Sequence, residues 1–242
     1  MCSREEFENN EQVQRLRALD QDSEEWVKAR REAVMLSASE IAAVTGHPKA
    51  SFSRAALWRY KMGQTESPAG TPSAYVQKLF DHGKTTEPVA LEFFAQHLRP
   101  TARVEKTGIW LLRQDPRIGA TPDAKVTEPN GVVVPLEVKC PYLDAYIPCE
   151  QRESKDLLQL QVQMEAMEAP YGYLLYFWSP SKHTLIVKQR RKEHWDDIYW
   201  LCWVFLDYVQ RGQEPPRSTP AQRQRERLTY ESAHPVNSSA TC

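Results

Sequence analysis

The sequence predicts an α/β protein in which helices flank a small mixed β-sheet. Apolar residues recur at helical spacing in the first third of the chain and again near its end. Between these regions, short runs rich in β-branched residues are bounded by Pro, Asp, Asn and Gly, which is typical of strands. The resulting order of helices, strands, helix, strands and helix favours helical layers packed around one sheet.

The individual elements follow from the same periodicities. Strands are predicted at 109–112, 118–120, 132–138, 171–178 and 184–188. Helices are predicted at 23–34, 37–46, 53–62, 153–168 and 194–210. Ser37 and Glu40 have capping-box spacing at the start of the second helix. Residues 73–97 are predicted as two helical pieces or one kinked helix, because Gly83 and Pro88 interrupt the pattern.

The length of 242 residues suits one domain with flanking segments. Residues 1–21 are polar and acidic and are predicted to be a loose lead-in. Residues 22–212 are predicted to form a single domain. Residues 213–242 are rich in Pro, Ser, Gln and Arg, a composition that predicts a disordered tail.

Charge and cysteine content narrow the class of protein. The net charge is −1, so any grip on nucleic acid must come from local patches. The five cysteines include no C-x-x-C pair, which argues against a zinc or iron–sulfur site. The longest apolar run, Ile198–Leu206, is far shorter than the roughly 20 residues of a membrane span. We therefore expect a soluble, intracellular protein that does not bind a membrane.

The residues that indicate chemistry are Asp123 and the Glu137-Val138-Lys139 stretch. Pro129-Asn130-Gly131 predicts a turn, so Asp123 and Glu137 should lie on or beside adjacent strands of one hairpin. Glu137 and Lys139 are two residues apart on a strand and should share a face.

Such a trio suits hydrolysis of a phosphodiester bond. Two carboxylates can hold Mg²⁺, which prefers oxygen ligands, and the metal makes a bound water more acidic. Lys139 can steer that water or stabilise developing negative charge. The carbonyl of Val138 is a candidate further ligand, and Glu87 is the candidate carboxylate from a helix. The alternative is an ordinary cross-strand ion pair on a solvated surface.

Several short motifs occur in one order along the chain, and together they resemble a known family. These are Trp26-x-x-x-Arg30, Leu36–Glu40, Gly83–Glu87, Ala120–Asp123, Leu136–Pro141 and Leu160–Gln163. The series resembles the lambda exonuclease and YqaJ-type viral recombinase family, within the PD-(D/E)xK nuclease superfamily. The likeness runs from about Trp26 to Pro180.

The resemblance implies a restriction-endonuclease-like core that binds two Mg²⁺ ions, for which Mn²⁺ can substitute. It implies a 5′-to-3′ exonuclease on the ends of linear duplex DNA, which leaves 3′ overhangs for recombination or annealing. A single-strand-annealing protein and a ring-shaped homotrimer are the implied partners. Carried over by motif, Asp123 and Glu137 resemble metal ligands, Glu87 the ligand of the second metal or its water, Lys139 the catalytic lysine, and Gln161 the glutamine at the back of the site.

The resemblance also implies a pocket for a 5′-phosphate formed by Arg30, Ser39 and Thr121. A guanidinium and hydroxyl groups are suitable donors to phosphate oxygens. The family carries a further arginine soon after its Glu-x-Lys motif, and residues 140–146 contain none. Arg152 and Lys155 are the candidate replacements. The accessory acidic residue that precedes the catalytic aspartate is also displaced here, and Asp115 is the nearest candidate.

Three other functions compete with the exonuclease. An endonuclease or end-processing nuclease could use the same core. A binding module with an inactive site is disfavoured, because Glu87, Asp123, Glu137 and Lys139 are all present. A CRISPR-associated nuclease with an iron–sulfur cluster would need four clustered cysteines, which the spread of the five cysteines does not provide.

Overall fold

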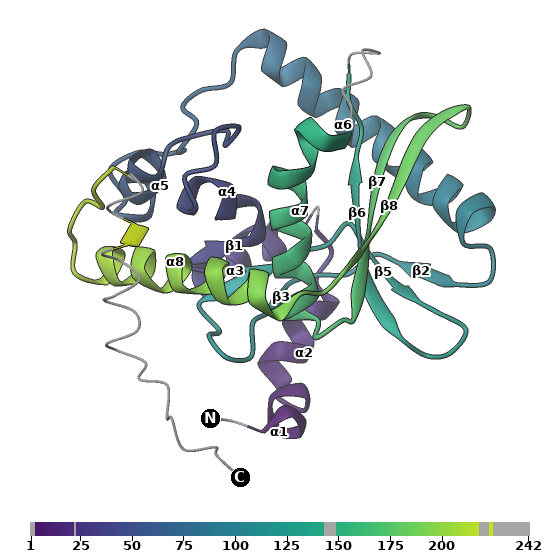
Figure 1. Ribbon diagram of the computed structural model, residues 1–242, viewed down its shortest axis with the longest axis horizontal. Coiled ribbons are helices and arrows are strands. Elements are labelled where there is room, and N and C mark those ends of the chain that lie inside the picture. The colour runs from purple at the N-terminus through teal and green to yellow at the C-terminus, as the bar shows by residue number, and fades with distance from the viewer. Residues whose placement is uncertain (1–2, 22, 143–148, 218–222, 225–242) are drawn as a thin grey trace. The chain divides into compact units, whose positions relative to one another are not determined.

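The computed structural model describes residues 3–21, 23–142, 149–217 and 223–224 (Figure 1). The sequence predicted one domain over 22–212. In the structure, the chain forms two compact units. The first unit comprises Met1–Ser39 and Thr71–Arg191, and the second comprises Glu40–Gly70 and Lys192–Cys242. Every residue that the sequence analysis selected for the site belongs to the first unit.

The first unit is built on two sheets. A five-stranded sheet has the order β2-β5-β6-β7-β8, in which β6 and β7 are parallel and the other neighbours are antiparallel. A three-stranded sheet has the order β1-β4-β3. The strands are β1 Leu36–Ser37, β2 Arg103–Glu105, β3 Trp110–Leu111, β4 Ile118–Ala120, β5 Ala124–Thr127, β6 Val133–Lys139, β7 Tyr171–Ser179 and β8 Lys182–Gln189. The predicted class, helices around a small mixed sheet, is confirmed.

Two long helices cover the five-stranded sheet (Figure 1). The helices of this unit are α1 Arg4–Glu8, α2 Glu11–Ala18, α3 Glu24–Ala33, α6 Ala74–Phe93, the π-helical η2 Phe94–Leu98, and α7 Cys149–Ala166. Ala90 and Phe94 pack with Val138 of β6 in one buried cluster. Leu160 and Met164 of α7 pack with Leu174 of β7 in another. Alternate residues of the central strands therefore face different helices.

Helix α6 differs from its prediction because it continues through both interruptions. Gly83 and Pro88 lie inside a single helix of 20 residues. The Thr85 hydroxyl donates a hydrogen bond to the carbonyl of Asp81 in the turn before the proline. The unbroken helix carries Glu87 on the same rigid element as Ala90, which is buried against the sheet.

The predicted helix at 37–46 is replaced by three shorter elements. Ser37 ends β1, a 3₁₀ turn η1 spans Ala38–Glu40, and α4 covers only Ile41–Val44. Glu40 is the N-cap residue of α4 and makes no side-chain cap hydrogen bond to that helix. Its carboxylate instead accepts a hydrogen bond at 2.9 Å from Lys61. Both side chains are largely buried, and a buried carboxylate without a partner would be strongly destabilising.

The second unit consists of α4, α5 Arg54–Lys61 and α8 Lys192–Gln210. The Trp58 indole N–H donates to the carbonyl of Tyr208 at 3.4 Å. Near the start of the predicted tail, Glu214 accepts a hydrogen bond from Arg59 of α5 at 2.9 Å. Residues 218–222 and 225–242 of that predicted tail lie outside the described residues. Among the described residues, no helix is long and apolar enough to span a bilayer.

The predicted loose lead-in, residues 1–21, is folded in the part that the structure describes. Phe7, Val13 and Leu16 are buried against Ile109 and Leu111. Both helices are capped, α1 by a capping box between Ser3 and Glu6 and α2 by Asn10. This polar segment contains a few apolar residues at helical spacing, and burial of those residues stabilises its helices.

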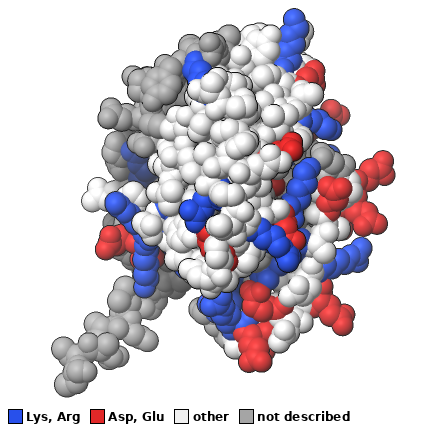
Figure 2. Space-filling view, turned by 90° about the vertical axis from the view of Figure 1, so that its right-hand side faces the viewer, with Lys and Arg blue, Asp and Glu red and all other residues white. Residues whose placement is uncertain are grey.

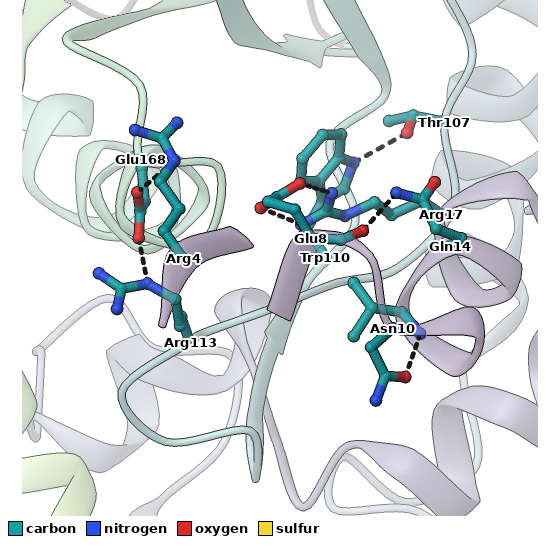
Figure 3. Close-up of polar contacts among 10 residues, drawn as sticks. Arg4, Glu8, Asn10, Gln14, Arg17, Thr107, Trp110, Arg113 and Glu168 are labelled. Atoms are coloured by element: carbon teal, nitrogen blue, oxygen red, sulfur yellow. Dashed lines mark hydrogen bonds and ion pairs between the residues drawn. The ribbon is translucent and has the colours of Figure 1, made fainter. Parts of the chain in front are cut away.

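Polar contacts fix these N-terminal helices to the rest of the unit (Figure 3). Arg17 of α2 pairs with Glu8 and lies 4.0 Å above the ring of Trp110. Glu168, at the end of α7, accepts from Arg4 and from Arg113. Since each cation connects separate parts of the chain, α1 and α2 are held as part of the domain.

Gln21 links this N-terminal region to the loop that precedes Asp123. Its side-chain amide donates to the carbonyl of Thr107 at 2.9 Å and to that of Pro122 at 2.6 Å. Pro122 directly precedes Asp123, so the N-terminal segment helps to fix the backbone of the candidate site.

Gly108 should be intolerant of a side chain, because α2 lies directly on it. A Cβ at this position would meet the carbonyl oxygen of Leu16 at 2.2 Å and that of Leu19 at 2.8 Å. These are backbone atoms that cannot move aside without shifting α2. We predict that Gly108→Ala lowers the free energy of unfolding by about 1–3 kcal/mol in urea denaturation.

Gly83 supplies the control for this measurement. It lies within α6, and a Cβ there would meet no atom within 4 Å. Gly83→Ala should therefore raise stability by about 0.5–1 kcal/mol through helix propensity. An equal effect of both substitutions would contradict the packing of α2 on Gly108.

Candidate active site

Strand pairing sets Asp123 opposite Glu137. β5 and β6 are antiparallel with Ala124 opposite Leu136, and extending this register by one residue pairs Asp123 with Glu137. Directly opposite residues share a face and have Cβ atoms about 4.5–5.5 Å apart. One carboxylate oxygen of Asp123 accepts the backbone N–H of Val138 at 2.6 Å. The backbone of β6 therefore fixes this carboxylate next to Glu137.

Glu137 is held through both of its oxygens. Its side chain is almost fully buried, at 4% exposure. Oε1 accepts from Lys139 Nζ at 2.5 Å and from the Gln159 amide at 2.6 Å. Oε2 accepts from the amide of Gln163. Three donors therefore hold this carboxylate in one orientation.

The expected position of Gln161 is corrected by this geometry. Gln159 and Gln163 are four residues apart on α7 and share the face toward Glu137, whereas Gln161 lies between them on another face. The amide of Gln161 donates to Glu165 at 2.9 Å, and Glu165 also accepts from Arg190 at 2.6 Å. Sequence reasoning missed Gln159 and Gln163, although the four-residue spacing of these glutamines was a visible signal.

Glu87 approaches the carboxylate pair from α6. Its charge raises the pKa of Asp123 and also that of Cys140, which places it near both side chains. Cys140 follows Lys139, and it packs with the cluster that includes Ala90 of α6. The predicted carboxylates Glu87, Asp123 and Glu137 are therefore brought into one region of the first unit.

The buried setting shifts the proton equilibria of the site. Burial, followed by the charges of Glu137 and Glu87, raises the pKa of Asp123 well above its usual value, against the opposing effects of Lys139 and the Val138 N–H. Burial alone would lower the pKa of Lys139, but the charges of Glu137, Asp156 and Asp123 outweigh it and raise the pKa. Lys139 is therefore a permanent cation and cannot act as a general base.

Cys140 is not a plausible nucleophile in this environment. Burial, followed by the charges of Glu87 and Asp123, raises the pKa of its thiol to about 12. A thiol with so high a pKa carries almost no thiolate near neutral pH, and the thiolate is the reactive form.

The donor set fits a hard divalent cation held partly by the backbone and solvent. Asp123 and Glu137 supply carboxylate oxygens, and burial, followed by the charges of Glu137 and Glu87, raises the pKa of Asp123. Among the described residues, no three His, Cys, Asp or Glu side chains form a group that could hold a metal by themselves. Mg²⁺ suits such a site, because it binds through one or two carboxylates and retains several waters or phosphate oxygens.

Arg30 forms a second polar cluster with two serines. Its guanidinium donates to the hydroxyl of Ser37 at 3.2 Å and to that of Ser39 at 3.3 Å. Ser37 was missed by the sequence analysis, which assigned it to a helix cap. Parallel pairing of Ser37 with Gly119 carries the chain after β1 and the chain after β4 toward the same edge. Thr121 and Asp123 follow β4 from that end of the strand pair, as Ser39 follows β1.

Asp115 was the candidate for the displaced accessory acidic residue, and Arg152 and Lys155 were the candidates for the missing arginine. Asp115 is buried and accepts from Arg117 through both oxygens, at 2.7 and 2.6 Å. This ion pair occupies its carboxylate within the loop between β3 and β4. The side chain of Arg152 lies outside the described part of the chain. Lys155 lies on α7, one residue before Asp156.

The face of the molecule drawn in Figure 2 carries no broad basic field. An uncharged expanse there is bordered by interspersed basic and acidic side chains. This agrees with the net charge of −1. A polyanionic ligand would have to be held by specific local groups, such as Arg30 and Lys139, rather than by the overall field.

Comparison with known proteins agrees with this class of fold. An alkaline exonuclease from Laribacter hongkongensis aligns with a TM-score of 0.60 and 18% identity, covering 87% of this chain and 98% of its own. Its structure in complex with dAMP aligns with a TM-score of 0.59 and 19% identity, over the same shares of the two chains. A phage-related exonuclease from Haemophilus somnus 129PT aligns with a TM-score of 0.55 and 14% identity, covering 74% and 95% of the two chains. No curated protein matches the sequence.

The sheet order, together with the buried Asp–Glu–Lys arrangement, defines an α/β domain of the nuclease-fold class. Residues 25–169 match the YqaJ-like viral recombinase domain. The chain belongs to this family, and the resemblance drawn from the sequence motifs is confirmed.

The raised pKa of Asp123 predicts that its charge destabilises the metal-free protein. Between the ordinary pKa of an aspartate and the raised folded value, the native state binds more protons than the unfolded state. Stability should therefore fall as pH rises through the folded pKa. We predict that Asp123→Asn, which can still accept the Val138 N–H, melts higher than the wild type in EDTA at pH 8. The expected shift is about 2–4 °C per kcal/mol of relieved repulsion.

Thermal melts of both proteins across pH, with EDTA or with Mg²⁺, test this prediction. The difference should vanish below about pH 4, where an aspartate is protonated in either state. It should also shrink in Mg²⁺ if the cation balances the charge. A wild type that melts as high as the variant in EDTA at pH 8 would show that the charge is already compensated.

Proposed function

We propose that this chain is a metal-dependent deoxyribonuclease, acting as a 5′-to-3′ exonuclease on linear duplex DNA and leaving 3′ single-stranded overhangs. The observation that carries the proposal is the convergence of Asp123, Glu137 and Lys139 at one end of β6, in a chain of the YqaJ-like family. The names of the structural neighbours, an alkaline exonuclease and a phage-related exonuclease, support the same activity.

The residues that would hold the metal are Asp123, Glu137 and the carbonyl of Val138. The N–H and C=O of one strand residue point to the same side of the strand. Since the Val138 N–H reaches Asp123, its carbonyl is directed to that side as well. Glu87 would serve a second ion or its water. Bound Mg²⁺, or Mn²⁺ in its place, would neutralise phosphate charge and make a bound water a better nucleophile.

Lys139 would stabilise the negative charge that develops on the phosphate. Its raised pKa keeps the side chain protonated, so it donates hydrogen bonds and does not take up a proton. In the structure its ammonium lies between Glu137 and the side-chain oxygen of Gln159, which accepts at 3.2 Å. These contacts hold the charge beside the carboxylates that would bind the metal.

The cluster of Arg30, Ser37 and Ser39, with Thr121 nearby in the strand register, is the proposed pocket for a 5′-phosphate. The Arg30 guanidinium is positioned by two hydroxyl groups, and all three groups can donate to phosphate oxygens. Such a pocket would select DNA ends over internal bonds. A ring-shaped trimer and a single-strand-annealing partner would follow from the family resemblance, and the measured mass of the protein in solution would test the trimer.

Digestion of linear duplex DNA in Mg²⁺ or EDTA tests the activity. We predict metal-dependent loss of the 5′-labelled strand, with closed circles left intact. Glu137→Gln and Lys139→Met should each lower the rate by about 10²-fold or more. Arg30→Ala should lower the preference for a 5′-phosphate over a 5′-hydroxyl by about tenfold or more, since a hydrogen bond to a charged group is lost.

Each alternative outcome identifies another function. Nicking of closed circles would favour an endonuclease on the same core. Removal of only a few terminal nucleotides would favour an end-processing enzyme. Folded protein that binds DNA but does not cut it with Mg²⁺ or Mn²⁺ would favour a binding module.

Gln163 provides a separate test of the proposed metal site. Its amide orients Glu137, and loss of an orienting hydrogen bond behind a metal ligand typically weakens metal binding by about 10- to 100-fold. We predict such a loss for Gln163→Met in calorimetric titration of the DNA-free protein with Mn²⁺. Gln161→Met is the matched control, because Gln161 is equally buried on α7 but contacts Glu165 instead. Equal effects of both substitutions would indicate a general perturbation of the helix.

A further inference from the structure

Tyr142 is a large aromatic side chain left exposed beside the candidate site. β6 ends at Lys139, and only Cys140 and Pro141 separate it from Tyr142. The Tyr142 side chain is about half exposed, at 49%. Exposed single apolar residues are common and need no explanation. The position of this one, three residues after the candidate catalytic lysine, is what makes it informative.

His82 of α6 holds the Tyr142 ring in a defined orientation. The two ring centroids are 5.3 Å apart and the ring planes are inclined at 85°, an edge-to-face contact. Such pairs are a favoured arrangement of aromatic rings. This contact leaves about half of the Tyr142 surface accessible.

The same two elements carry the carboxylates. Glu87 lies five residues after His82 on α6, which corresponds to a rise of about 7.5 Å. The charges of Glu87 and Asp123 raise the pKa of the Cys140 thiol. Cys140 lies two residues before Tyr142, which is at most about 7 Å along an extended chain. Tyr142 therefore lies at most about two base steps, at 3.4 Å per step of a DNA strand, from Cys140, the residue whose thiol pKa Glu87 and Asp123 raise.

Recognition of a neutral group suits this location. The carboxylates give the region a negative potential, so phosphates gain little there without a metal. A nucleobase is uncharged and presents a flat π-face, and stacking on an aromatic side chain is a common way to hold single nucleotides of any sequence. We propose that Tyr142, supported by His82, stacks on a nucleobase within the first two nucleotides of the DNA strand that enters the site. This inference rests on the proposed function.

A binding experiment with damaged DNA ends tests the stacking directly. Duplexes would carry a normal or an abasic nucleotide at the first or second position of the 5′ end, and affinity would be measured in Ca²⁺ with cleavage checked on gels. Tyr142→Ala should lose about 5- to 150-fold in affinity for the normal end, and Tyr142→Phe should stay near the wild type. The abasic substitution should cost the wild type a similar factor but cost Tyr142→Ala little, because the same contact is already missing.

Fluorescence gives an independent readout of the same contact. 2-Aminopurine at the stacked position should be quenched on binding to the wild type and to Tyr142→Phe, and not on binding to Tyr142→Ala. Tyr75→Ala is the matched control, because Tyr75 is equally exposed, at 51%, but lies twelve residues before Glu87 on α6. This control should bind and quench like the wild type.

The outcomes separate this inference from the proposed function. Wild-type protein that binds and digests DNA ends, with Tyr142→Ala binding them equally well and quenching 2-aminopurine equally, would overturn the stacking alone. Fully additive losses from Tyr142→Ala and the abasic end would also overturn it. Wild-type protein that binds no DNA end would overturn the proposed function and this inference together.

Discussion

Antiparallel pairing of β5 with β6 forces two carboxylates, those of Asp123 and Glu137, toward each other at the end of a largely apolar sheet. Like charges in a poorly hydrated place repel, and the raised pKa of Asp123 is the result. The strands cannot relieve the repulsion, because a shift in register would turn their buried residues to the wrong face. In the proposed function, a bound cation would relieve this repulsion without moving the backbone.

Helices α7 and α6 place different groups beside the pair of carboxylates, Asp123 and Glu137. From α7, Gln159 and Gln163 orient the Glu137 carboxylate through hydrogen bonds. From α6, Glu87 adds a third negative charge near Asp123. Because the supporting groups lie on long helices packed against the sheet, the positions of the side chains are set by rigid elements rather than by loops.

The three-stranded sheet positions the polar cluster of Arg30, Ser37 and Ser39, which is the proposed phosphate pocket. Its parallel β1–β4 pair brings Ser37 and Gly119 side by side. Ser37 ends β1 and Ser39 follows it, and both contact Arg30 of α3, whereas Asp123 follows β4. Gln21 then ties that loop to the N-terminal segment through Pro122. Residues more than 80 positions apart in sequence thereby form one continuous region.

The sequence by itself determined the positions of Asp123, Glu137 and Lys139, because strand alternation and a Pro-Asn-Gly turn are local properties. It did not determine which glutamine of α7 meets Glu137, since that depends on the rotation of the helix, which packing of Leu160 and Met164 against β7 fixes. Nor did it reveal that residues 1–21 are folded. Phe7, Val13 and Leu16 are too few to stand out in a polar segment, and only Ile109 and Leu111, about a hundred residues away, provide the apolar surface that buries them.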